Sequence, residues 1–87
     1  MNLPLTVVYT HDAAKTLKRL DVPTRMRMKE KIDAVAANPY DPVNSYPLTG
    51  TEKRSARVGG FRIILVIHDP NLLVVDIESR GQVYKRI

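Results

Sequence analysis

The sequence predicts an α+β fold, in which a small twisted antiparallel sheet carries a helical hairpin on one face in the order β-α-α-β-β-β. The sheet is predicted by two apolar, β-branched runs, residues 61–67 and 72–77, and by the turn-like composition of the four residues between them. The helices are predicted by apolar residues that recur at helical spacing over residues 13–36. A chain of 87 residues is expected to form one domain, residues 1–87.

The first half of the chain is predicted to contain one strand and two helices. Residues 5–9 have the composition of a short strand, and Thr10 is a suitable N-cap for the helix that follows. Pro23 ends the first helix and suits the first turn of the second, which Asn38-Pro39 then stops. The side chains expected to face the core are Ala13, Ala14, Leu17 and Leu20 in the first helix and Met26, Met28, Ile32, Val35 and Ala36 in the second.

The second half is predicted to form the rest of the sheet. Residues 40–52 are rich in Pro, Asn and Ser and are expected to be a loop. Residues 53–58 are a strand candidate, and Gly59-Gly60 makes a tight turn into residues 61–67. Because residues 61–67 and 72–77 are almost wholly apolar, we expect both strands to be buried on both faces or nearly so. The strand at residues 5–9 is expected to join this meander, and residues 80–87 leave it as a basic tail.

Composition excludes several classes of protein. The net charge of +5 and a pI near 9.8 favour a polyanion or an acidic protein as partner. The chain has no cysteine, no signal-peptide pattern and no apolar run near the roughly 18 residues needed to span a bilayer, so a cytoplasmic protein with no membrane partner is expected. No metal-ligand spacing, phosphate-binding glycine loop or nucleophile–histidine pattern is present. We therefore expect no metal and no cofactor.

Three arginines are expected to meet on the sheet. Arg57 precedes the glycine turn and Arg62 follows it, so the two can flank each other across the hairpin. The next strand runs antiparallel to that of Arg62, so Arg80 returns to the same edge. Three guanidinium groups on one face would bind phosphate bidentately, and Tyr84 nearby could stack on an unpaired base. The structural alternative is that these arginines pair with Asp76 or Glu78 and only rim the sheet.

The chain resembles the RelE branch of the RelE/ParE toxin superfamily. The resemblance covers nearly the whole chain and is carried by the element order, by the segment Arg57-Val-Gly-Gly-Phe-Arg62 and by the ending Ser79-Arg80-Gly-Gln-Val-Tyr84. It implies a toxin of a type II toxin–antitoxin system that cleaves mRNA in the ribosomal A site and inhibits translation, with the RNA's own 2′-hydroxyl as nucleophile and without a metal. It also implies a RelB-like antitoxin as partner, with operator DNA bound only through the antitoxin complex.

The resemblance implies a role for each matching residue. Arg62 would stabilise the charged phosphate, Arg80 would be the general acid for the leaving 5′-oxygen, and Tyr84 would stack on the cleaved nucleotide. Arg57 would help to activate the 2′-hydroxyl. The chain departs from some members at Ser55, where they have a lysine, so the general base is left unassigned. Further contacts to RNA are expected from Lys53, Arg54, Lys85 and Arg86.

Two other functions remain open at this level. A ParE-like toxin would bind DNA gyrase and would cleave nothing itself. A catalytically inactive basic module would bind only an antitoxin-like partner or operator DNA.

Overall fold

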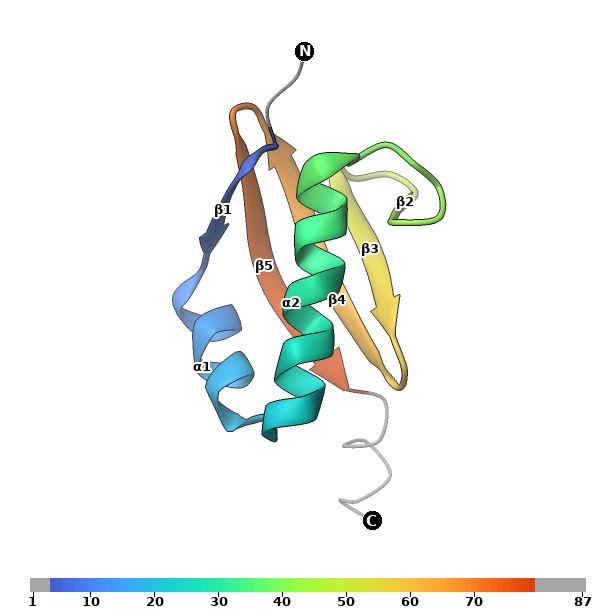
Figure 1. Ribbon diagram of the computed structural model, residues 1–87. Helices are drawn as coiled ribbons and strands as arrows, with labels where there is room; N and C mark the ends of the chain where they lie inside the picture. The colour runs from blue at the N-terminus through green and yellow to red at the C-terminus, as the bar shows by residue number, and fades with distance from the viewer. Residues whose placement is uncertain (1–3, 80–87) are drawn as a thin grey trace.

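The computed structural model describes residues 4–79 and has the predicted α+β architecture, with one mixed sheet and two helices on one of its faces (Figure 1). The helices cross the sheet on the same side, α2 along the middle and α1 at one edge. The sheet also contains one short strand that the sequence does not predict. In chain order the elements are β1 (Thr6–Tyr9), α1 (His11–Arg19), α2 (Val22–Ala37), β2 (Tyr46–Pro47), β3 (Lys53–Val58), β4 (Phe61–His68) and β5 (Asn71–Ser79).

The strand order is β1-β5-β4-β3-β2, and one pairing differs from the prediction. The pairs from β2 to β5 are antiparallel as expected, whereas β1 pairs with β5 in parallel. The reason is the path of the chain, because α2 returns it to the end of the sheet where β1 began (Figure 1). Three alternating strands then leave β5 running in the same direction as β1. The prediction of a wholly antiparallel sheet is therefore wrong at this edge.

The β4–β5 hairpin lies at the centre of the sheet, and its turn is shorter than predicted. The strands extend to His68 and Asn71, which pair with each other and leave only Asp69-Pro70 between them. Burial also differs from the expectation of two covered faces. Side chains along β5 alternate between buried and more exposed positions, and a register shift interrupts the pairing after Ile64. This alternation follows from the helices, which cover only one face of the sheet.

The hydrophobic core lies between the helices and this covered face. Met28, Ile32 and Val35 of α2 are at most 1% exposed and pack with the inward-facing side chains of the central strands. The predicted stripes are confirmed except at two positions: Ala14 is only half-buried and lies outside the core, and Met26 is 59% exposed. Met26 lies two positions from Met28, which places it on the other side of a helix with 3.6 residues per turn. The strand residues in the core are Ala56, Ile63, Leu65, Leu72, Val74 and Ile77.

The start of α1 is tied to the sheet by one side chain. Thr10 is the N-cap, as predicted, and its hydroxyl accepts a hydrogen bond of 3.1 Å from the backbone N–H of Ala13. The same hydroxyl donates to the carbonyl of Val75 at 2.6 Å, and the Thr10 N–H donates to the carbonyl of Val74. Val75 is the residue that the register shift leaves without a partner on β4. Thr10 therefore caps α1 and also supplies a hydrogen bond to the carbonyl of Val75, where the β4–β5 ladder is interrupted.

We expect Thr10→Ala to lower the free energy of unfolding by about 1–2 kcal/mol, because both hydrogen bonds of the hydroxyl are lost. Thr10→Ser keeps the hydroxyl group and is the matched control, with an expected cost below about 0.5 kcal/mol. Urea denaturation followed by circular dichroism measures both values. Equal losses in the two variants would show that the methyl group, and not the cap, is what matters at this position.

Candidate functional site

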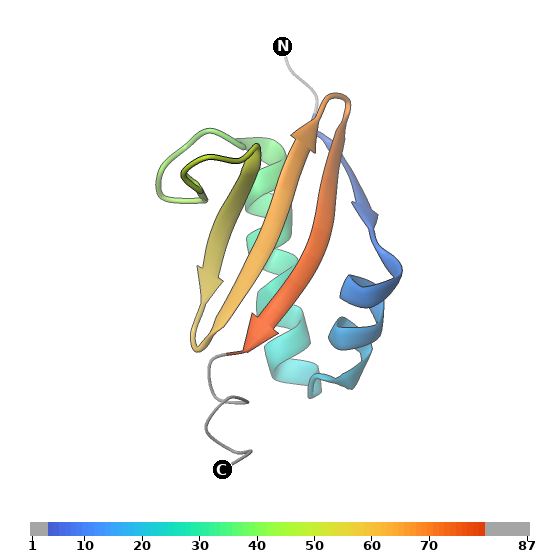
Figure 2. The same ribbon diagram turned by 180° about the vertical axis from the view of Figure 1, so that it is seen from behind.

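The face of the sheet that α1 and α2 leave uncovered carries the candidate site (Figure 2). We call it the open face, and within residues 4–79 no helix lies over it. Directly paired residues of neighbouring strands point to the same side of a sheet. The pairing therefore defines rows across the open face. One row is Arg57, Arg62 and Glu78; the next is Tyr46, Ser55, Ile64 and Asp76; a third is Lys53, Val66, Leu73 and Val8.

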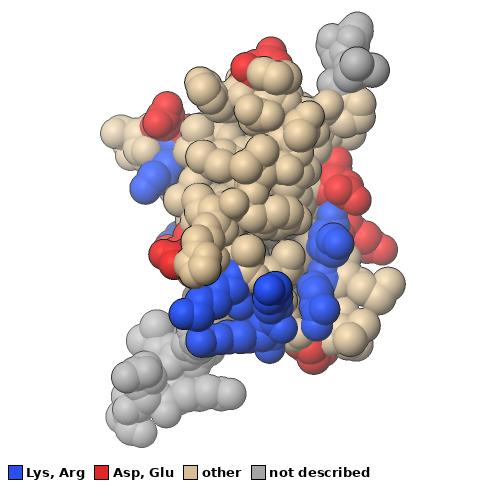
Figure 3. All heavy atoms as spheres, turned by 90° about the vertical axis from the view of Figure 1, so that its left-hand side faces the viewer, with Lys and Arg blue, Asp and Glu red and all other residues tan. Residues whose placement is uncertain are grey.

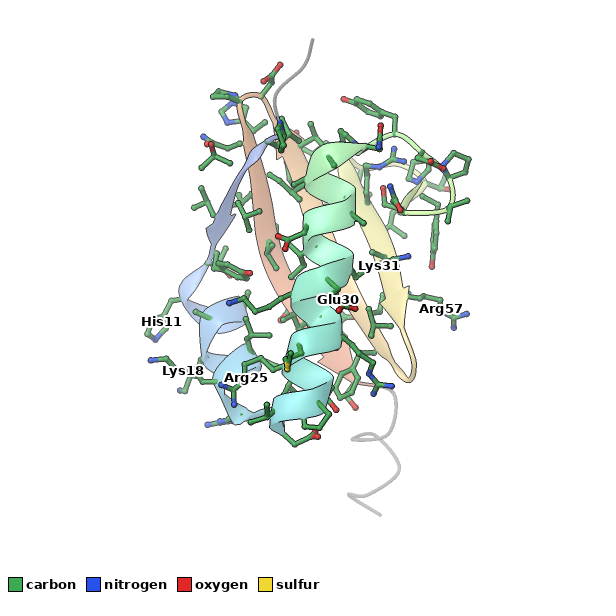
Figure 4. All side chains as sticks on the ribbon, in the orientation of Figure 1. His11, Lys18, Arg25, Glu30, Lys31 and Arg57 are labelled. Atoms are coloured by element: carbon green, nitrogen blue, oxygen red, sulfur yellow. The ribbon has the colours of Figure 1, made fainter. Side chains whose placement is uncertain are left out.

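The first row brings two of the predicted site residues together. Arg57 of β3 is the direct cross-strand partner of Arg62 of β4, as predicted from the glycine turn, and Arg62 is in turn the partner of Glu78 of β5. Arg57 points outward from β3, away from α2 (Figure 4). Like charges directly opposite each other repel across a sheet. The ion pair between Arg62 and Glu78 offsets this repulsion. Arg57 has no ion-pair partner within the described part of the chain.

Arg62 is held by Glu78 through two hydrogen bonds. Its Nη2 and Nε donate to the same carboxylate oxygen, Oε1, at 2.7 and 3.2 Å. These bonds and the negative charge of Glu78 raise the pKa of Arg62, and the nearby hydroxyl of Tyr46 adds to the effect. Both side chains of the pair remain nearly half exposed, at 46% and 45%. A guanidinium carries five N–H donors, so three of those of Arg62 remain for another ligand.

Tyr46 reaches the site from β2, inside the stretch that was predicted to be a loop. It pairs with Ser55 and keeps 41% of its surface exposed beside Arg62. Ser55 itself is fully buried, and its hydroxyl has no hydrogen-bond partner among residues 4–79. The position where some RelE-like toxins have a lysine therefore presents no group to solvent here. Lys53, two residues earlier on the same face, is exposed and lies one row further from Arg62.

Arg54, which was predicted to contact RNA, lies on the opposite face of β3. It pairs with Leu65, whose side chain is in the core. Its Nε and Nη2 donate to the hydroxyl and the carbonyl of Ser45 at 2.8 and 3.1 Å, and its guanidinium lies 5.3 Å from the centre of the Tyr40 ring. Arg54 thus fastens the loop between α2 and β3, and the structure does not bring it together with Arg57 and Arg62.

The remaining predicted site residues, Arg80, Tyr84, Lys85 and Arg86, lie outside the described residues. The strand that leads to them has the predicted direction. Leu72 pairs with Ile67 near the turn, and Glu78 pairs with Arg62 at the far end. The last residue of β5, Ser79, pairs with Phe61, immediately beside Arg62 in the chain.

Basic side chains gather at the same end of the molecule as the arginine row. Figure 3 shows Lys and Arg clustered at the lower end of the side that carries β1 and α1. Lys15, Lys18 and Arg19 are exposed on α1, and Figure 4 shows Lys18 pointing outward there. The turn between Arg57 and Arg62 lies at this lower end as well (Figure 1). This end of the protein is therefore suited to a negatively charged partner.

Glu78 and Tyr46 are the two members of this site that the sequence did not predict as functional. The sequence predicts Glu78 only as a possible ion-pair partner of the arginines. The register between β4 and β5 decides whether Asp76 or Glu78 lies opposite Arg62, and the sequence does not give that register. Tyr46 lies in a two-residue strand with no alternating pattern that could reveal it. Two further findings concern the described residues only. No three His, Asp or Glu side chains are placed to hold a metal ion, and no helix is long and apolar enough to cross a membrane.

Comparison with known proteins identifies the family. A family model described as the ParE toxin of the type II toxin–antitoxin system parDE matches residues 7–84. The chain belongs to this toxin family. It is thus a toxin of a type II toxin–antitoxin system. No curated protein matches its sequence.

Solved structures share the fold of this toxin. A chain of the toxin–antitoxin complex RelBE2 from Mycobacterium tuberculosis superposes with a TM-score of 0.77 at 24% identity, over 90% of this chain and 100% of that one. A chain of the intact E. coli RelBE complex gives 0.76 at 19% identity, over 86% and 95%. The YoeB dimer from Staphylococcus aureus gives 0.74 at 14% identity, over 90% and 99%. The chain therefore has the fold of the RelE toxins.

Proposed function

We propose that this toxin is a ribosome-dependent mRNA endonuclease, in which the 2′-hydroxyl of the RNA attacks the adjacent phosphorus. The observation that carries the proposal is the direct opposition of Arg57 and Arg62 on the open face. Two arginines whose Cα atoms lie about 5 Å apart across a strand pair repel each other, and an anion bound between their guanidinium groups removes the repulsion. A bound phosphate removes that repulsion and gains charge-assisted hydrogen bonds from both.

The proposed chemistry places most of the task on charge stabilisation. The transition state of phosphoryl transfer carries extra negative charge on the phosphate oxygens, and fixed cationic donors favour it over the ground state. Arg62 has three N–H donors left for this task after its bonds to Glu78. Arg57 would polarise the 2′-hydroxyl through its charge. The resemblance supplies the remaining roles, with Arg80 as general acid and Tyr84 stacking on the nucleotide.

We also infer an antitoxin partner and a cytoplasmic setting. Two of the structural relatives are RelBE toxin–antitoxin complexes, and the net charge of +5 suits an acidic partner. A RelB-like antitoxin that covers Arg57 and Arg62 would block access of RNA to the site. The target in this proposal is mRNA in the ribosomal A site, which requires the ribosome to position the substrate. Operator DNA would be bound only through the antitoxin complex.

A second function, inhibition of DNA gyrase, is favoured by one observation: the matching family model is that of ParE. The two are separated by expressing the wild-type chain, Arg62→Ala and the control Arg27→Ala from an inducible promoter in a bacterial host. Arg27 is exposed on α2, away from the open face. Primer extension on an abundant mRNA is then combined with a reporter of DNA damage.

For an endonuclease, we expect new mRNA ends within translated codons in the wild type and in Arg27→Ala, and none in Arg62→Ala. Growth arrest with intact mRNA and an active DNA-damage response would favour the gyrase function instead. No arrest from any of the three proteins would favour a module that only binds a partner.

A further inference from the structure

We propose that Glu78 is the general base that removes the proton from the 2′-hydroxyl of the RNA. This inference rests on the proposed endonuclease function and names a residue for its unassigned step. The residues assigned so far include no group that can accept the proton of the 2′-hydroxyl. At neutral pH the arginine side chain is already protonated and has no site that accepts a further proton, so neither Arg57 nor Arg62 can be the base. The hydroxyl at Ser55 is fully buried, and substrate cannot reach it.

Glu78 has the position that this step requires. Its carboxylate lies 2.7 Å from Nη2 of Arg62, so a phosphate bound to the free N–H groups of Arg62 would lie beside Glu78. Both Arg62 bonds go to Oε1, and Oε2 has no hydrogen-bond partner within residues 4–79. The side chain is 45% exposed and thus accessible to substrate. The 2′-hydroxyl and the phosphate of one nucleotide can therefore meet Oε2 and Arg62 together.

The other acid on this part of the open face is less suitable. Asp76 precedes Glu78 by two residues and lies in the next row, opposite Ile64 and not opposite an arginine. Its Oδ1 accepts a hydrogen bond of 2.9 Å from the backbone N–H of Ile77. Asp76 is thus part of the local structure of β5. The charged and titratable groups that face Glu78 from the other strands are Arg62 of β4, Arg57 and Lys53 of β3 and Tyr46 of β2, with His68 at the far end of the face.

Oε2 of Glu78 takes the proton of the 2′-hydroxyl while the 2′-oxygen forms its bond to phosphorus. The bond from phosphorus to the 5′-oxygen breaks and its electron pair stays on that oxygen, which is protonated by the general acid that the resemblance assigns to Arg80. The products are a 2′,3′-cyclic phosphate and a 5′-hydroxyl. Glu78 then releases its proton to solvent, and the general acid takes one back from solvent. Arg62 has two tasks here, to bind the phosphate and to orient the base through Oε1.

Two substitutions separate a base from a residue that only positions Arg62. Glu78→Gln keeps the length of the side chain and an oxygen that accepts from Arg62, but it cannot take up a proton. Glu78→Asp keeps the carboxylate and shortens the side chain. If Glu78 is the base, Asp is more active than Gln; if it only positions Arg62, Gln is more active than Asp. Single-turnover cleavage of mRNA on purified ribosomes gives both rates, and Glu30→Gln on the exposed face of α2 is the matched control for charge.

We expect Glu78→Gln to reduce the cleavage rate by about 10²–10⁴-fold, with half-saturation by ribosomes unchanged or improved because one negative charge is removed. Glu78→Asp is expected to lie between Gln and the wild type. Thermal unfolding of the Gln variant should be unchanged. Full activity of Glu78→Gln, or a higher rate for Gln than for Asp, would overturn the role of Glu78 while the endonuclease function stands. No cleavage by the wild type would overturn both.

Discussion

Leu72→Ala is expected to remove about 2–5 kcal/mol from the free energy of unfolding, a large part of the total for a domain of this size. Leu72 is fully buried on β5 and belongs to the core between the sheet and the helices. It pairs with Ile67 on one side and with Val7 on the other, so the cavity would open in the middle of the sheet. The walls of such a cavity belong to regular elements on both sides and can collapse only in part.

The next residue provides the control. Leu73 lies on the same strand, but it faces the open side and is only partly buried. The same substitution, Leu73→Ala, is therefore expected to cost less than half as much, because less apolar surface leaves water on folding. Urea denaturation of both variants gives the two losses in free energy of unfolding. The substitution is the same in both, so the change in side-chain volume and in strand propensity is equal. Equal costs would show that the open face is a second core and would weaken its assignment as a binding surface.

The sequence was least informative about which side chains of the central strands face the core, as the two leucines illustrate. Residues 61–67 and 72–77 are apolar at almost every position, so their composition predicts strands but does not distinguish the covered face from the open one. The distinction comes from the helices, which lie on one side only (Figures 1 and 2). The direction of β1 was missed for a similar reason, because a four-residue strand carries no signal of its neighbour.

The central part of the site, by contrast, could be predicted from local rules. Gly59 has a positive φ of 58°, which favours glycine, and the turn that it begins with Gly60 places Arg57 opposite Arg62. Alternation along β3 also separates Arg54 from Arg57, since neighbouring strand residues point to opposite faces. Glu78 and Tyr46 depended on contacts between more distant segments. The predicted alternative, an ion pair between an arginine and Glu78, is present at Arg62. It leaves the Arg62 side chain 46% exposed on the open face.

The second large effect is expected from Arg62→Lys, which keeps the charge and changes only its shape. Lysine has three donors on one ammonium group in place of the five on a planar fork, so it cannot give two hydrogen bonds to Oε1 of Glu78 and a bidentate pair to phosphate at once. We expect the single-turnover cleavage rate on ribosomes to fall by about 10²–10³-fold, the range found when one donor to a developing oxyanion is removed. Half-saturation by ribosomes should change only by a few-fold, because the attraction between charges is kept.

Arg27→Lys makes the same exchange on the exposed surface of α2 and should cleave as fast as the wild type. Comparison of the two variants shows whether the site needs only a positive charge or a guanidinium held in one orientation. A rate for Arg62→Lys near that of the wild type would mean that Arg62 acts as a point charge, and that its bonds to Glu78 have no part in catalysis. A large loss of rate with little change in half-saturation would mean that the fork is used in the transition state and not for binding the substrate. The arrangement of Arg57, Arg62 and Glu78 in one row favours this second result, because the two hydrogen bonds to Glu78 hold the plane of the Arg62 guanidinium in one orientation.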